Sequence, residues 1–192
     1  MHVVAESLVS SNGFDACANA GFVFGCVDND GPRLVLLELC CSQRKPYLDL
    51  ASDIPAPGVF VGRIVFTGIG KGCLSCREEL DQKEIWRFFA TPEQRAEDDK
   101  IYGIKRTSLG ESGPSVVFLN GVIASLAVTE FVSFTTGICA PIAHLNYRGE
   151  MGIVTTTKAV GSGCYYCDKI WSGRAVAESQ RYLQRASQQG QS

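Results

Sequence analysis

The chain has 192 residues and a formal net charge of -2; 45% of its residues are hydrophobic and 20% are charged. This length suffices for one domain with its own hydrophobic core. The charge is near neutral and no basic block stands out, which argues against a nucleic-acid partner. We therefore expect a single domain over residues 1–192, with a disordered Gln-rich tail at about 188–192.

The amino terminus has no basic segment followed by an apolar one, so the sequence predicts no secretory signal. The most apolar segment, Val116 to Phe134, contains polar side chains such as Asn120 and Glu130. A membrane span tolerates such groups poorly, so a buried helix is favoured over a transmembrane one. Nine cysteines in such a chain favour reduced thiols or metal ligands over disulfides, which predicts a cytoplasmic protein without a membrane partner.

The first elements expected are a strand, a helix and a second strand. The apolar run at residues 21–27 predicts a buried strand, and a helix is expected from about Pro32 to Gln43. Asp30 is the expected amino-terminal cap of that helix. Tyr47 to Leu50 predicts the next buried strand. This order indicates a parallel pair of strands.

The rest of the chain alternates between extended and helical patterns, which predicts a mixed α/β sheet with flanking helices. The polar segment from Pro92 to Asp99 is compatible with an exposed helix or a loop. The other expected elements are a strand at Val59 to Thr67, a helix at Leu80 to Ala90, a long apolar helix between Pro114 and Gly137, strands near Ile142 to Tyr147 and Gly152 to Lys158, and an amphipathic helix at Arg174 to Ser187.

Two similar cysteine turns are the strongest motif in the sequence. Residues 70–76 (GKGCLSC) and 161–167 (GSGCYYC) each place two cysteines three positions apart after glycines. Two such turns can complete a tetrahedron of four sulfurs, the usual structural Zn²⁺ site. The alternative is a thioredoxin-like redox pair, but that motif usually occurs once. We therefore predict a closed zinc site made by Cys73, Cys76, Cys164 and Cys167.

The remaining cysteines have apolar neighbours, which favours small core residues over a catalytic role. These are Cys17, Cys26, Cys40, Cys41 and Cys139.

An acidic turn follows the first predicted strand. Asp28, Asn29 and Asp30 stand where this strand gives way to a helix. Ligands of open parallel sheets bind beyond the carboxyl ends of the strands, and a carboxylate there can hold Mg²⁺. The same residue types also cap helices and form turns, so both roles remain open on this pattern.

The whole string at residues 22–33 (FVFGCVDNDGPR) resembles the strand-end motif of the ThiF/MoeB/HesA family. Segments 46–50 (PYLDL), 62–65 (GRIV), 72–76 (GCLSC), 120–130 (NGVIASLAVTE) and 164–167 (CYYC) are similar to later parts of that family, in the same order. The resemblance implies a partial Rossmann-like fold. It also implies an enzyme that uses ATP and Mg²⁺ to adenylate the carboxyl-terminal glycine of a ubiquitin-like or sulfur-carrier protein.

By this likeness, Asp28 would bind the Mg²⁺ of MgATP, while Asn29 and Arg33 would support the loop or contact the nucleotide. Arg33 can equally be structural. Family members commonly form homodimers, so a homodimer is a possible assembly.

Two departures from the family pattern bear on activity. No G-x-G-x-x-G loop precedes Asp28, so the sequence is expected to lack the amino-terminal nucleotide-binding half. The segment from Arg77 to Gly113 lacks the cysteine of relatives that form a thioester. Two hypotheses follow: an adenylyltransferase or its catalytic remnant, and a non-catalytic interaction module that binds a ubiquitin-like partner.

Overall fold

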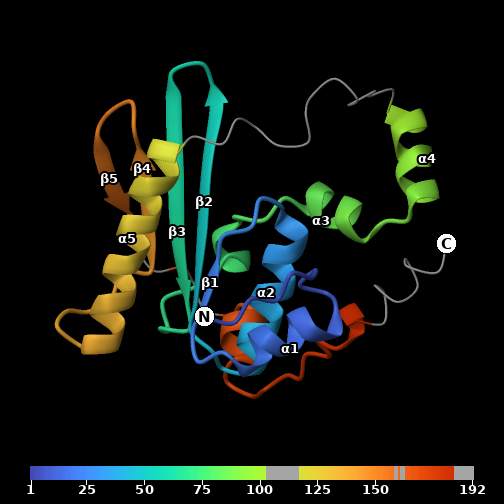
Figure 1. The fold of residues 1–192 in the computed structure, drawn as a ribbon, viewed down its shortest axis with the longest axis horizontal. Helices are drawn as coiled ribbons and strands as arrows, with labels where there is room; N and C mark the ends of the chain where they lie inside the picture. The colour runs from blue at the N-terminus through green and yellow to red at the C-terminus, as the bar shows by residue number, and fades with distance from the viewer. Residues whose placement is uncertain (103–116, 158–159, 161–162, 184–192) are drawn as a thin grey trace.

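The computed structural model describes residues 1–102, 117–157, 160 and 163–183 (Figure 1). Its centre is a five-stranded mixed sheet whose strands are neighbours in chain order. The first two strands are parallel and the others antiparallel, so the predicted parallel pair is confirmed. The strands are β1 (Val23–Gly25), β2 (Tyr47–Ala56), β3 (Val59–Thr67), β4 (His144–Arg148) and β5 (Ile153–Thr156).

Helices flank the sheet, as expected for a mixed α/β fold. The helices are α1 (Ser11–Asn19), α2 (Asp30–Ser42), α3 (Gln82–Phe89), α4 (Pro92–Tyr102) and α5 (Val117–Thr136). In Figure 1, α5 covers one face of the sheet, where it packs on β2 and β3, while α2 lies by the opposite side of the sheet beside η3 (Tyr165–Ile170).

The alternation of side chains along the strands creates two separate apolar clusters. Leu48, Ile64 and Phe66 face α5 and pack with its Ile123 and Ala127. Tyr47 and Val65 face the other way and pack with residues of α2 and the cysteine turns. Because successive strand residues point to opposite faces, β2 and β3 supply both clusters at once.

Helix α2 begins differently from the prediction. Asn29, not Asp30, is its cap, because the Asn29 side chain accepts a hydrogen bond of 2.8 Å from the N–H of Gly31. Asp30 is the first helical residue, and its carboxylate instead accepts the N–H of Asp81, at 2.7 Å. The carboxylate of Asp30 therefore ties the start of α2 to the start of α3.

Helix α5 packs on the sheet through one face only. Its mean hydropathy is 1.7, and 28% of its apolar window is buried, so by length and composition alone it could cross a membrane. Core helices pass the same test, and this helix by itself decides nothing about a membrane. The expectation of a buried helix holds for the face with Leu119, Ile123 and Ala127. The opposite face leaves apolar side chains exposed: Val117, Phe118, Val128 and Val132.

The predicted start of the carboxyl-terminal helix, which was expected at Arg174 to Ser187, is wrong. Residues 174–180 are not helical, and helical backbone begins at Arg181. The N–H groups of Arg174 and Ala175 both bond to the carbonyl of Lys169, which ends the preceding turn instead of starting a helix. Residues 184–187, the predicted tail at 188–192, Pro114 and Lys158 lie outside the described residues.

Candidate metal centre

The first cysteine turn follows β3. Gly68, Gly70 and Gly72 all have positive φ, and the value of 104° at Gly72 directly before Cys73 favours a residue without Cβ. The chain then enters a short 3₁₀ helix, η1 (Ser75–Arg77). The N–H of Cys73 donates to the Sγ of Cys76 at 3.0 Å, so the backbone turns one of its amides toward a sulfur.

The second cysteine turn lies at the start of a short π-helix, η3 (Tyr165–Ile170). Cys164 occupies the cap position and Cys167 follows within the helix. The carboxylate of Asp168 accepts the N–H of Cys164 at 3.0 Å and also that of Gly163. These two bonds fix the backbone before the helix, and so they set the direction in which both thiols point.

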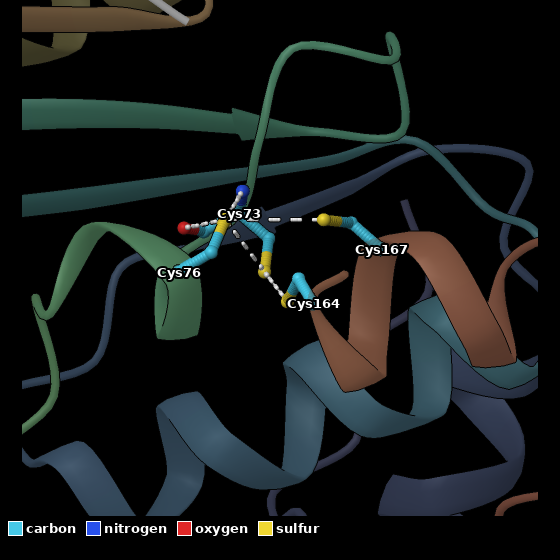
Figure 2. Close-up of side chains that lie close together, drawn as sticks. All are labelled: Cys73, Cys76, Cys164 and Cys167. Carbon is cyan, nitrogen blue, oxygen red and sulfur yellow. Dashed lines mark hydrogen bonds between the residues drawn. The ribbon is translucent and has the colours of Figure 1, made fainter. Parts of the chain in front are cut away.

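The two turns bring their four sulfurs together (Figure 2). The Sγ atoms of Cys73 and Cys164 are 3.6 Å apart, those of Cys73 and Cys76 3.7 Å, and those of Cys76 and Cys167 3.8 Å. All four lie within 4.8 Å of one another. Sulfurs at about 2.3 Å from a tetrahedral Zn²⁺ would be about 3.8 Å apart. The four predicted cysteines thus converge and could hold a metal ion.

Contacts among the sulfurs shift the pKa values of Cys73, Cys76 and Cys167 in different directions. Hydrogen bonds from the other thiols, that of Cys167 first, lower the pKa of Cys73 to about 6. Burial raises the pKa of Cys76 to about 11. The pKa of Cys167 is also raised, chiefly because its thiol bonds to the Cys73 sulfur. A bound cation would stabilise the other thiolates, so metal binding should release protons.

The cluster lies inside a hydrophobic surround. Cys73 and the adjacent Leu74 are fully buried, and they share a core with Leu37 and Cys41 of α2 and Ile170 of η3. Two chain segments 91 residues apart therefore meet at the sulfurs. Four thiols would leave no open coordination position, which suits a structural rather than a catalytic ion.

A small cavity of about 190 Å³ reaches the edge of the cluster. One wall is Cys167 itself, and three glycines of the first turn form another. The full lining is Gly68, Gly70, Gly72, Val160, Cys167, Asp168 and Trp171.

The other cysteines follow the core prediction only in part. Cys40 and Cys41 are fully buried, and burial raises the pKa of Cys40 to about 12, as expected for inert core thiols. Cys17 is half-buried. Cys26 and Cys139 are exposed, so their assignment to the core is wrong. Cys26 follows the end of β1 and Cys139 follows the end of α5. Apolar neighbours in sequence do not guarantee burial at such positions.

The acidic turn is arranged around the start of α2. Asp28 is exposed after β1, and Asn29 caps α2. Among the described residues, the four cysteines are the one group of three or more side chains close enough to hold a metal ion together. Asp28 does not belong to it. The Mg²⁺ role of Asp28 therefore stays a prediction.

Arg33 is buried and engaged inside the fold. Its guanidinium pairs with Asp30 at 3.3 Å and with Asp49 at 3.2 Å. It also donates to the carbonyls of Val27 and Leu50. Arg33 thus links the loop after β1 to β2, and its contact with a nucleotide stays a prediction.

A buried charged network beside this loop was missed by the sequence interpretation. Asp49 is fully buried on β2, and Arg63 of β3 lies 3.6 Å from its carboxylate. Arg63 also pairs with Glu79 at 3.3 Å, and Glu79 lies 3.3 Å from His144 of β4. A charged residue within an apolar strand, as Asp49 is, was the one available signal, since buried charges require partners.

No family model matches this chain, and no curated protein matches it either. The likeness to the ThiF/MoeB/HesA family therefore depends on the motifs alone.

Proposed function

We propose that the chain is a ThiF-type adenylyltransferase, or its catalytic remnant, that holds a structural zinc ion and activates the carboxyl-terminal glycine of a ubiquitin-like or sulfur-carrier protein. The observation that carries the proposal is the meeting of the two cysteine turns, which the family pattern requires to converge although they are 91 residues apart. The motif order and the parallel β1–β2 pair add support.

The proposed ion is Zn²⁺. Four thiolates at tetrahedral spacing suit Zn²⁺ or an iron site, and among these Zn²⁺ is the usual structural ion. Its role would be to join the segment after β3 to the segment around η3. The thiolates would take no part in the reaction, because an ion with four sulfur ligands has no open coordination position for a substrate.

The proposed reaction transfers an adenylyl group. A carboxylate oxygen of the carrier's last glycine bonds to the α-phosphorus of ATP, the bond from that phosphorus to the bridging oxygen breaks, and pyrophosphate leaves. Negative charge on the triphosphate must be neutralised for the anionic carboxylate to approach. The exposed carboxylate of Asp28 would hold the Mg²⁺ that supplies this neutralisation, since Mg²⁺ prefers oxygen ligands.

The second candidate is a non-catalytic module that binds a ubiquitin-like partner. The specific observation that favours it is the state of Arg33, whose guanidinium is engaged by Asp30, Asp49 and two carbonyls. A guanidinium held in this way is poorly placed to contact a nucleotide. In this case the fold and the metal site would persist without ATP chemistry.

The deciding experiment compares Asp28→Asn with Asp53→Asn. Asp53 is an exposed carboxylate on β2, away from the turn after β1, so it is a matched control. MgATP binding is measured by calorimetry, and exchange of labelled pyrophosphate into ATP is measured with a carrier protein that ends in glycine. We expect Asp28→Asn to abolish exchange and Asp53→Asn to leave it unchanged.

Absence of MgATP binding and of exchange in the parent chain would refute the adenylyltransferase proposal. Binding of the carrier without any exchange would instead support the interaction module.

A further inference from the structure

The four sulfurs differ in their access to solvent. Cys73 is fully buried, while Cys76, Cys164 and Cys167 are half-buried. Of the four, Cys167 lines the cavity of about 190 Å³ beside the centre. A water molecule occupies about 30 Å³ in the liquid, so this cavity admits a molecule as small as hydrogen peroxide. Cys167 is therefore the sulfur of the four that a small oxidant inside this cavity would meet.

One sulfur beside Cys167 belongs to the other turn. The Sγ of Cys76 lies 3.8 Å from that of Cys167, and Cys164 in turn has Cys73 at 3.6 Å. A disulfide needs the two sulfurs to approach to about 2.05 Å, so both side chains must rotate toward each other. The arrangement thus offers Cys76 as the partner that would resolve an oxidised Cys167.

We infer that the metal centre is a redox-sensitive junction, in which peroxide entering the cavity oxidises Cys167 and Cys76 then closes a disulfide between the two turns. The inference rests on the proposed zinc site. In the first step the Cys167 thiolate attacks one peroxide oxygen, the O–O bond breaks, and the departing hydroxide takes a proton to become water. The product is a sulfenic acid.

In the second step the Cys76 thiolate attacks the sulfenic sulfur, and hydroxide leaves and takes a second proton. The sum is two thiolates, one peroxide and two protons giving one disulfide and two waters. The sulfurs lose two electrons and the peroxide gains them. The ion then keeps only two of its four ligands and is released.

The disulfide would then link the two cysteine turns that the ion had linked. A Cys76–Cys167 bond spans the same two segments, so oxidation should release zinc without separating η3 from the end of β3. A linkage within either turn, in contrast, would leave the two segments joined only by packing.

The experiment uses the full zinc-loaded chain treated with hydrogen peroxide, with release followed by a zinc-sensitive dye. Val160 lines the cavity and lies over Gly72, so Val160→Ala widens the cavity and Val160→Phe fills it. Val176→Ala is the matched control, since Val176 is 87% exposed and lies outside the cavity. We expect release to be several-fold faster in Val160→Ala, several-fold slower in Val160→Phe and unchanged in Val176→Ala.

Peptide mapping of the oxidised chain then identifies the disulfide, and Cys76 linked to Cys167 is the expected product. Equal release rates in the three variants would overturn the inference, as would a product linked within one turn. A parent chain that binds no zinc when purified would refute the proposed metal centre first. The two failures are therefore distinguishable.

Discussion

At the scale of single residues, the charged network next to the centre shows how burial is compensated. Burial raises the pKa of Asp49, and the guanidinium groups of Arg33 and Arg63 oppose that shift. Tyr47 adds a hydrogen bond of 2.8 Å from its hydroxyl to the Asp49 carboxylate. Because one buried carboxylate is shared by two guanidinium groups, removal of either would leave a charge poorly compensated.

Glu79 gives this network a defined dependence on pH. A hydrogen bond from His144, followed by the charges of Arg63 and Arg77, lowers the pKa of Glu79 from its ordinary value of 4.5. A carboxyl group whose pKa is lower in the folded state than in the unfolded state stabilises the fold fully when the pH is above its unfolded-state pKa. That stabilisation is lost as the pH falls through the folded value.

We therefore expect Glu79→Gln to lower the free energy of unfolding by about 1 kcal/mol at neutral pH. The difference from the parent should shrink as the pH falls below 4.5, the unperturbed value of this carboxyl group. Denaturant unfolding at a series of pH values measures it. Glu78→Gln, at an exposed neighbouring position, is the control and should change little. A difference that is the same at neutral and acidic pH would contradict this account.

At the scale of elements, α2 and α3 approach each other closely at a glycine. A Cβ on Gly31 would lie 2.2 Å from Cγ and 2.4 Å from Cβ of Phe88. These are atoms near the root of the Phe88 side chain, so a change of its outer rotamer cannot relieve the clash. Gly121 on α5 is the opposite case, since a Cβ there would meet nothing within 4 Å.

Gly31→Ala should therefore destabilise the protein by about 1–3 kcal/mol through overpacking between the two helices. Gly121→Ala makes the same chemical change at an exposed position of a helix and should stabilise by about 0.5–1 kcal/mol. Thermal or urea unfolding of both variants tests the pair. Equal effects of the two substitutions would mean that α2 and α3 are not in the close contact described.

The elements also show what local sequence can predict. β3 was predicted at its observed bounds, because Val59–Thr67 is rich in β-branched and aromatic residues. β2 was predicted to end at Leu50 but continues to Ala56, because pairing with β3 extends a segment of weak strand propensity. α1 was missed although Ser10 caps it, since a cap without a strong apolar period is a weak signal.

At the scale of the whole molecule, the two apolar clusters should respond differently to loss of the proposed zinc ion. The cysteine turns belong to the cluster with α2, whereas Leu48 and Ile64 belong to the cluster under α5. The sequence could predict which four cysteines come together, because Cys-x-x-Cys spacing is a local property. It could not predict the cavity or the cluster that surrounds the sulfurs, because both depend on contacts between distant segments.

Removal of zinc by a chelator should speed amide hydrogen exchange at Leu74 and Ile170 at least about tenfold. This factor corresponds to a decrease of about 1.4 kcal/mol in the free energy of local opening. Exchange at Leu48 and Ile64 should stay unchanged. Cys164→Ser should reproduce the effect without chelator, and Cys139→Ser, at an exposed cysteine outside the centre, should not. The zinc content of both variants is measured by atomic absorption. Uniform acceleration of amide exchange along the chain would contradict the prediction.

The separation of the two cysteine turns along the chain has a consequence during translation. Cys164 leaves the ribosome 91 residues after Cys73, which at about 5–20 residues per second is a delay of roughly 5–18 s. Neighbouring strands such as β2 and β3 can pair in the meantime. The newly made thiols of the first turn must therefore stay reduced until their counterparts emerge, and the cysteine cluster can close only after the second turn has been made.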